Sequence, residues 1–216
     1  MNERSYSRAI LLALAGLIVF ESTAGFAQAG SVQGFAIVPK KSEVRFVIDE
    51  LLFGKPKSVV GRTSKISGSV GVDMTGATGL RWLPIRVDAQ DLTTDNSFRN
   101  KALRNQILGA NKKEFRYIVF KPVRVEGLAD PKTVNIGEPI MLRVIGDLTI
   151  RGVTRPVAFD MTLTATSARE LEGFGTAIIT RSEFELWLPK VRNVADVSEE
   201  ILLEVDVGMA AIGTTD

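Results

Sequence analysis

The 216-residue sequence predicts an all-β domain, an eight-stranded antiparallel barrel with one short α-helix. Three observations lead to this fold class. Segments with alternating apolar and polar residues recur along the chain, short stretches with glycine or proline separate them, and a single segment has helical spacing instead. Successive antiparallel strands joined by short turns commonly close into a barrel, because closure removes sheet edges that would otherwise be exposed.

Residues 1–29 have the pattern of a secretory signal peptide. Arg4 and Arg8 precede the apolar run Ala9–Phe20, and Ala27-Gln28-Ala29 offers small residues at a cleavage site. We expect cleavage after Ala29 and a periplasmic mature protein, with an uncleaved membrane anchor as the alternative. A lipid-modified anchor is excluded because the sequence has no cysteine to acylate. Residues 30–216 are expected to form one domain.

The N-terminal half of the mature chain contains three predicted strands. Glu43–Asp49 and Arg81–Gln90 alternate regularly, whereas Val59–Asp73 is a weaker strand whose glycines suggest bends or bulges. The residues expected to face inward from the two regular strands are Val44, Phe46, Ile48, Leu83, Ile85, Val87 and Ala89.

One segment interrupts the succession of strands. Asp95-Asn96-Ser97 offers side chains that can cap a helix, and Phe98–Leu108 has apolar residues at helical spacing. A short amphipathic helix is expected here. Its role is either a plug over one end of the barrel or a gate for a ligand.

Five predicted strands fill the C-terminal half. Pro156–Ala165 is the clearest, because every second residue from Val157 onward is apolar. The last strand has the same pattern from Ile201 to Met209. The other segments are Phe115–Val125, Met141–Ile150, Gly173–Leu188 with an interruption near Arg181-Ser182, and the last strand itself, Glu200–Ile212.

The composition excludes several kinds of active site. With no cysteine and no histidine, the chain can have no disulfide, no thiolate or imidazole metal ligand, no cysteine nucleophile and no Ser-His-Asp triad. Carboxylate pairs and a Ser-Lys arrangement remain conceivable, yet neither has a local sequence signature. We therefore expect a protein that is not an enzyme, with no catalytic residues, no metal site and no cofactor.

The charges are nearly balanced. Lys and Arg number 27 and Asp and Glu number 25, which gives a formal net charge of +2. Lys55-Pro56-Lys57 and Lys112-Lys113 are short basic groups beside turns, and they do not form the broad cationic face of a nucleic-acid-binding protein. No nucleic acid is expected as a partner.

A ten-residue segment resembles a known family. Leu148–Val157 reads LTIRGVTRPV and is similar to the two-strand corner of the YceI-like family, a leucine-threonine-isoleucine-basic-glycine-valine-threonine run that ends in proline-valine. Further similar segments follow in the right order, and the resemblance covers roughly Phe35 to Ile212. These segments are Lys41–Phe46, Ser67–Val70, Asp91–Asp95 and Arg181–Phe184.

The resemblance implies a lipocalin-like barrel, exported to the periplasm, that binds a long isoprenoid lipid such as a quinone tail or a polyprenyl phosphate. An eight-stranded barrel has an interior just wide enough for side chains or one slender ligand. Taken alone, the apolar strand faces would indicate a filled core, whereas the resemblance favours a tunnel. The residues expected to line it and bind the lipid are Phe46, Ile48, Ile85, Val87, Phe120, Val144, Phe159, Met161 and Phe184.

Several alternatives stay open from the sequence. One is a secreted interaction or stress-related module with a filled core and binding loops near Lys55 or Asn193. Trp82 and Trp187 belong either to the mouth of the barrel or to the ordinary surface, and the sequence does not decide whether the protein touches a membrane transiently or forms a homodimer. Another is a carboxylate-based hydrolase, for which the available residues are Asp88, Asp91, Asp95, Asp147 and Asp160.

Overall fold

The computed structural model describes residues 32–73, 81–127 and 135–212. The predicted signal peptide and its cleavage site lie outside the described residues. Strands dominate, and the predicted all-β antiparallel barrel with one short helix is confirmed, although the described residues form thirteen strands where eight were predicted. None of the described helices is long and apolar enough to span a membrane.

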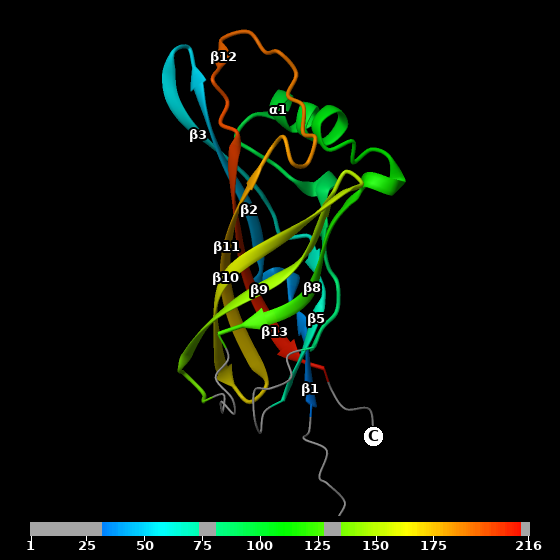
Figure 1. Ribbon diagram of the computed structural model, residues 1–216, viewed down its shortest axis with the longest axis vertical. Coiled ribbons are helices and arrows are strands. Elements are labelled where there is room, and N and C mark those ends of the chain that lie inside the picture. Colours follow the sequence, from blue (N-terminus) through cyan, green and yellow to red (C-terminus); the bar gives the residue numbers. More distant parts are fainter. Residues whose placement is uncertain (1–31, 74–80, 128–134, 213–216) are drawn as a thin grey trace, which may run out of the picture.

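The strands form one thirteen-stranded sheet that curls into a nearly closed barrel (Figure 1). The hydrogen-bonded order runs β4-β7-β8-β9-β10-β11-β13-β1-β5-β6, with β2 beside β13 and β3 beside β2, and the strand pairs are antiparallel. The bounds are β1 Val32–Ile37, β2 Glu43–Leu52, β3 Lys55–Thr63, β4 Ile66–Ser67, β5 Ser69–Asp73, β6 Arg81–Trp82, β7 Ile85–Asp88, β8 Tyr117–Glu126, β9 Pro139–Ile150, β10 Val153–Ser167, β11 Glu170–Thr180, β12 Val194–Ala195 and β13 Glu200–Ala211.

One chain segment, residues 55–73, closes the barrel. Its three strands take different partners, because β3 pairs with β2, β4 pairs with β7 and β5 pairs with β1. Gly68, at the junction of β4 and β5, has φ +155° and a Cβ there would lie 3.1 Å from Ile85 Cγ1. Glycine therefore lets the chain change partners at this point, which is the bend that the weak strand pattern predicted.

The predicted strand Arg81–Gln90 is divided in two. Pro84 separates β6 from β7, because proline has no N–H to donate to a sheet. Leu83 is exposed, so the prediction that it faces inward was wrong, whereas Val87 and Ala89 are buried as expected.

The predicted strand Gly173–Leu188 ends early, as β11, at Thr180. The chain then turns, with Glu185 at φ +53° and the Leu186 N–H donating to the Arg181 carbonyl. Beyond the turn lies a long connection to β13, which we call the mouth loop and define as residues 181–199. The Arg181 side chain ties its two ends together, since it donates to the carbonyls of Val197 and Ser198.

The predicted helix is present, and it begins at the predicted capping residues. Helix α1 spans Ser97–Ala102 and continues as a wider helical turn, η3, over Leu103–Ile107. The Asn96 side chain accepts a hydrogen bond from the Arg99 N–H at 3.0 Å, which is the geometry of an N-cap. Short 3₁₀ turns lie at Pro39–Lys41, Ala89–Asp91 and Lys113–Phe115.

Helix α1, the tip of the β2–β3 hairpin and the mouth loop gather at one end of the barrel, which we call the mouth (Figure 1). The C-terminal strand runs away from this end. Inside the barrel, the alternating residues form one continuous apolar core, as the strand faces predicted. Val157, Leu163 and Ala165 of β10 and Val207 and Met209 of β13 are among its buried members.

Candidate functional site

The described part of the barrel holds two neighbouring apolar cavities. The inner cavity has a volume of about 120 Å³ and the outer cavity about 500 Å³. Small-molecule sites typically measure roughly 300–1,000 Å³, so the outer cavity alone is in that range. The interior is therefore hollow over part of its length, which differs from the filled core that the apolar faces alone would indicate.

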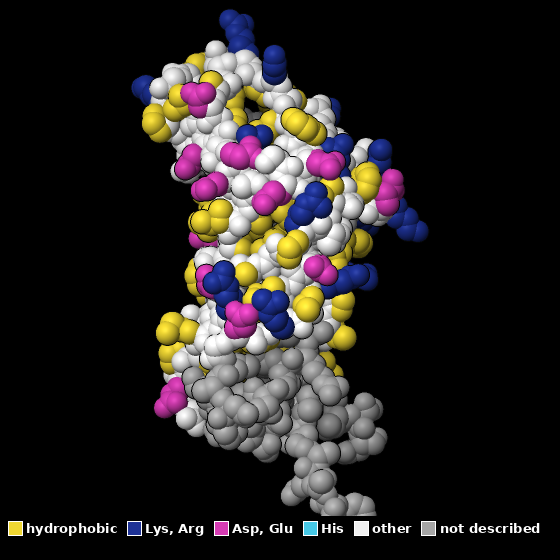
Figure 2. Space-filling view, viewed as in Figure 1, with side chains coloured by type: hydrophobic (Ala, Val, Ile, Leu, Met, Phe, Trp, Pro, Cys, Tyr) yellow, Lys and Arg dark blue, Asp and Glu magenta, His cyan; other side chains and the backbone are white. Residues whose placement is uncertain are grey.

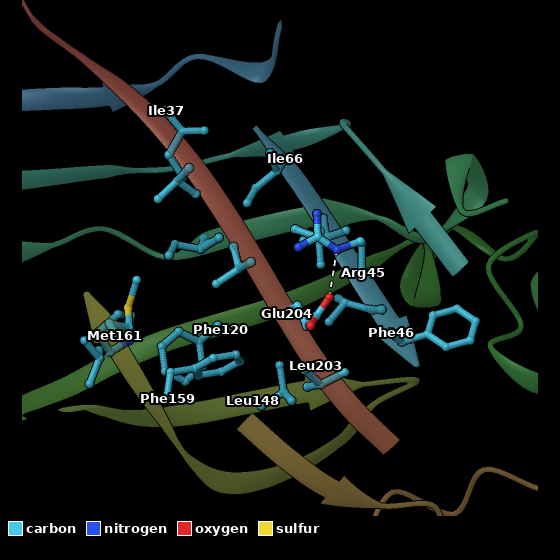
Figure 3. A pocket seen from close by; sticks show the side chains of 18 of the residues that line it. Ile37, Arg45, Phe46, Ile66, Phe120, Leu148, Phe159, Met161, Leu203 and Glu204 are labelled. Atoms are coloured by element: carbon cyan, nitrogen blue, oxygen red, sulfur yellow. Dashed lines mark hydrogen bonds and ion pairs between the residues drawn. The ribbon is translucent and has the colours of Figure 1, made fainter. Parts of the chain in front are cut away.

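The strands of the barrel build the inner cavity (Figure 3). Residues of β2, β7, β8, β9, β10 and β13 supply most of its wall, the others being Ile37, Ile66, Ser69 and Leu92, and every wall residue is buried or half-buried. Phe120 and Phe159 meet edge to face, with ring centroids 5.0 Å apart. This contact fixes the positions of two of the largest side chains of the wall.

The charged side chains of the inner wall are bound to each other. Arg45 donates to Glu204 at 2.8 Å and to Glu43 at 3.0 Å, and it forms an ion pair with Asp206 at 2.6 Å. Hydrogen bonds to Glu204 and Glu43 raise the pKa of the Arg45 guanidinium above its ordinary value, so it stays charged. The charged groups of this cluster bind one another between neighbouring strands, so the rest of the cavity wall is apolar.

The outer cavity lies under the mouth and is built from different elements. The end of β2, the start of β3, helix α1 and the mouth loop surround it, and several wall residues are exposed, so this cavity opens to solvent. Its wall is mostly apolar. The polar and charged members are Glu50, Lys57, Asn96, Arg99, Arg181 and Arg192.

An ion-pair network ties helix α1 to the β2–β3 hairpin across this cavity. Arg99 of α1 binds Glu50 of β2 at 2.8 Å and Asp95 at 2.5 Å, and Lys57 of β3 binds Asp95 at 2.6 Å. The Glu50 side chain is only 7% exposed, so Arg99 compensates for a carboxylate removed from water. The hydrogen bond from Lys57, together with the nearby Arg99, lowers the pKa of Asp95.

Five residues belong to both cavity walls and form a ring between the cavities, which we call the boundary ring: Phe46, Leu92, Ile118, Ile150 and Leu203. Phe46 is its largest member, and its ring lies flat against Gly61 of the neighbouring strand. A Cβ at Gly61 would come within 2.0 Å of Phe46 Cε1, so only glycine admits the ring in this position. The two cavities therefore meet at a ring of apolar side chains.

The nine residues predicted to line a tunnel fall into three groups. Ile48 lies in the outer wall and Phe46 in both walls. Phe184, a residue of the mouth loop, lies in neither wall; it is only 1% exposed and packs into the apolar core. Lipid binding by the nine residues stays a prediction. The remaining six lie in the inner wall: Ile85, Val87, Phe120, Val144, Phe159 and Met161.

Sequence reasoning missed most of the outer wall. Leu186 and Leu188 were assigned to a strand, yet they reach the outer cavity from the mouth loop. Glu50 was missed because the predicted strand ended at Asp49. Its signal was present, since Glu50 is in phase with the inward row of Phe46 and Ile48.

The two tryptophans differ in what the structure describes. Trp187 is 76% exposed and lies in the mouth loop between two residues of the outer wall. This position agrees with a mouth residue. The side chain of Trp82 lies outside the described part of the structure.

The carboxylates do not converge in either cavity. Glu204 is the carboxylate of the inner wall and Glu50 that of the outer wall, and each is paired with an arginine. Among the five aspartates considered for catalysis, Asp88 binds Arg116 and Asp160 lies 3.7 Å from Arg143. Within the described residues, no group of three or more acidic side chains could hold a metal ion.

The fold and the cavities can now be compared with known proteins. The YceI-like domain matches residues 35–209 of this chain. The chain belongs to the YceI-like family. No curated protein sequence matches it.

Solved structures share the fold of this YceI-like barrel at low sequence identity. A polyisoprenoid binding domain from Saccharophagus degradans, implicated in plant cell wall breakdown, has a TM-score of 0.64 and 14% identity over 82% of this chain and 98% of that one. Burkholderia cenocepacia BcnA has a TM-score of 0.59 and 19% identity over 80% and 98%. A Campylobacter jejuni YceI protein has a TM-score of 0.55 and 19% identity over 71% and 85%.

Proposed function

We propose that this YceI-like protein is a non-catalytic carrier that holds one long isoprenoid lipid inside its barrel. The observation that carries the proposal is the pair of apolar cavities, which share the boundary ring and of which the outer one opens at the mouth. A prenyl tail is long, slender and apolar, so it matches a hollow of this shape. The Saccharophagus degradans domain with the same fold is named as a polyisoprenoid binding domain, which supports this ligand class.

The tail supplies most of the binding free energy in this proposal. Burial of apolar surface contributes roughly 25 cal/mol per Å², so a chain of several isoprene units binds tightly without a specific polar contact. The head group, a quinone or a polyprenyl phosphate, then lies in the outer cavity. The cationic side chains there are Lys57, Arg99, Arg181 and Arg192.

The proposal includes export. Residues 1–29 direct the chain to the periplasm and are removed after Ala29, so the mature protein begins at Gly30. Intact-mass measurement of the protein from a periplasmic fraction tests this directly. A mass that includes residues 1–29 would contradict it.

Lipid extraction tests the carrier function. Protein made in its native host and extracted with organic solvent should release about one prenyl lipid per chain, detected by mass spectrometry. Leu203→Trp adds bulk to the boundary ring and should abolish recovery of that lipid, whereas Leu202→Trp, on the opposite face of the same strand, should retain it. The proposal fails if wild-type protein releases no stoichiometric lipid, or if both variants retain it equally.

A further inference from the structure

Large apolar side chains are exposed around the mouth of the barrel. Phe53 is 71% exposed, Phe98 84% and Val191 54%, and all three line the outer cavity. Trp187 is 76% exposed and does not itself line this cavity, but its two chain neighbours, Leu186 and Leu188, do. We call Phe53, Phe98, Trp187 and Val191 the apolar rim.

The rim comes from three separate parts of the chain. Phe53 lies at the β2–β3 turn, Phe98 in α1, and Trp187 and Val191 in the mouth loop. Figure 2 shows a hollow near the top of the molecule edged by hydrophobic side chains. Apolar residues scattered over a surface need no explanation, but aromatic residues from three segments around one opening mark an interaction site.

Basic side chains accompany the rim. Lys55 adjoins the tip that carries Phe53, and Lys190 and Arg192 flank Val191; all three are exposed, and none has an ion pair within the described residues. Lys and Arg side chains project beyond the hollow in Figure 2. Of the acidic residues at this end, Glu50 and Asp95 are already bound by Arg99 and Lys57, whereas Glu185 and Asp196 of the mouth loop are exposed and have no ion pair in the part of the chain that the structure describes.

Aromatic side chains with lysine and arginine beside them have the chemistry that binds the interface of a bilayer. The aromatic rings enter the headgroup region, and each cation near an anionic surface is stabilised electrostatically. We infer that the mouth docks against an anionic phospholipid bilayer, with the apolar rim inserted and Lys55, Lys190 and Arg192 facing the headgroups.

This inference rests on the proposed carrier function and extends it, because it says how a water-insoluble chain reaches the cavity. With the rim in the bilayer, the outer cavity opens directly onto the lipid phase. A tail then slides from hydrocarbon into the barrel without crossing water, which avoids the free-energy cost of exposing it.

Vesicle co-sedimentation tests the docking separately from the cavity. The probes are vesicles of phosphatidylcholine with phosphatidylglycerol and vesicles of phosphatidylcholine alone, neither containing a prenyl lipid. Wild-type protein should bind the anionic vesicles more tightly, and the double variant Phe53→Ser with Phe98→Ser should bind them about tenfold less. The double variant Lys190→Glu with Arg192→Glu should lose the preference for anionic vesicles.

A matched control replaces exposed apolar residues away from the mouth. Val123 and Met141 are 67% and 78% exposed on the barrel wall, and serine at both positions should leave vesicle binding within about twofold of wild type. Quenching of tryptophan fluorescence by brominated phospholipid gives a second readout. Trp187→Phe should remove most of that quenching.

Each outcome has a definite meaning. Equal loss in the rim and control variants, or no vesicle binding by the wild-type protein, overturns the docking. If the rim variants instead change the oligomeric state without vesicles, the rim is a contact between copies of the chain and the inference is wrong. Recovery of stoichiometric prenyl lipid without vesicle binding contradicts the docking and supports the carrier function. Vesicle binding without prenyl lipid supports the docking and contradicts the carrier function.

Discussion

The inner and outer cavities are made from the same barrel by different means. Strand residues build almost all of the inner wall, together with Leu92, and every one of these residues is buried or half-buried. A hairpin tip, a short helix and the mouth loop build the outer wall, which includes exposed and charged residues. On the proposed function, the sheet fixes the shape of the hollow that holds the tail, while the loops surround its opening.

The largest effect should come from a charge in the inner wall. Val144 is 1% exposed, so Val144→Asp should lower the free energy of unfolding by about 4 kcal/mol or prevent folding. Val191→Asp in the exposed outer wall should change it by less than about 0.5 kcal/mol. Urea unfolding measures both variants. Similar losses in the free energy of unfolding would mean that the two walls do not differ in how well they tolerate a charge. Should Val144→Asp fail to fold, Val144→Thr gives a measurable loss of about 1–3 kcal/mol.

A smaller loss should follow from removing the arginine that holds α1 over the outer cavity. Arg99→Ala leaves the buried carboxylate of Glu50 without its partner, and we expect the free energy of unfolding to fall by about 2–3 kcal/mol. Arg124→Ala removes a comparable ion pair with Glu126 that is exposed, and should cost less than about 0.5 kcal/mol. Equal effects in thermal or urea unfolding would show that burial of Glu50 is unimportant.

The boundary ring can be widened with little loss of stability. Phe46→Leu keeps an apolar residue opposite Gly61 and should cost about 1 kcal/mol. On the proposed function, the smaller side chain leaves more room between the two cavities. Lipid extracted from this variant should therefore shift toward longer or bulkier chains. Ile178→Leu, on the outer face of β11, is the control and should leave the lipid profile unchanged. An unaltered profile in Phe46→Leu would mean that Phe46 does not limit the tail.

The smallest effect concerns pH. The pKa of Asp95 is lowered from its ordinary 3.8, first by the hydrogen bond from Lys57, so its ion pairs stabilise the fold above that pH and are lost as the pH falls through the lowered value. The Asp95 side chain is 56% exposed, which keeps this contribution below about 1 kcal/mol. An NMR titration of the carboxyl carbon should give a midpoint below 3.8, and Lys57→Met should move it upward. A midpoint insensitive to this substitution would contradict the assigned cause.

The sequence predicts the inner cavity better than the outer one, for a physical reason. Strand residues alternate with period two, so the inward positions of Val144, Phe159 and Met161 follow from the pattern itself. An extended loop with apolar residues at the same spacing gives the same pattern, which is why Leu186 and Leu188 were assigned to a strand. The two-residue period does not show where the chain leaves the sheet.

Contacts between distant segments were beyond the sequence. The Glu50–Arg99 pair joins residues 49 positions apart, and nothing local to either residue indicates the other. The cap of α1 was predictable because Asn96 and Arg99 are neighbours along the chain. The volume left inside the barrel was also unpredictable from the strand pattern, since an apolar face can pack against itself or leave space.

The Arg181 side chain fixes the two ends of the mouth loop, so the residues between them can vary. Its guanidinium holds the carbonyls of Val197 and Ser198 and pairs with Glu199, so the loop begins and returns at one fixed point beside β11 and β13. Substitutions or changes of length between residues 187 and 193, which spare the buried Phe184 and Leu186 and the pairing of β12 with β2, should therefore leave the register of those strands intact. A barrel of constant interior can in this way acquire a different opening by alteration of a single connection.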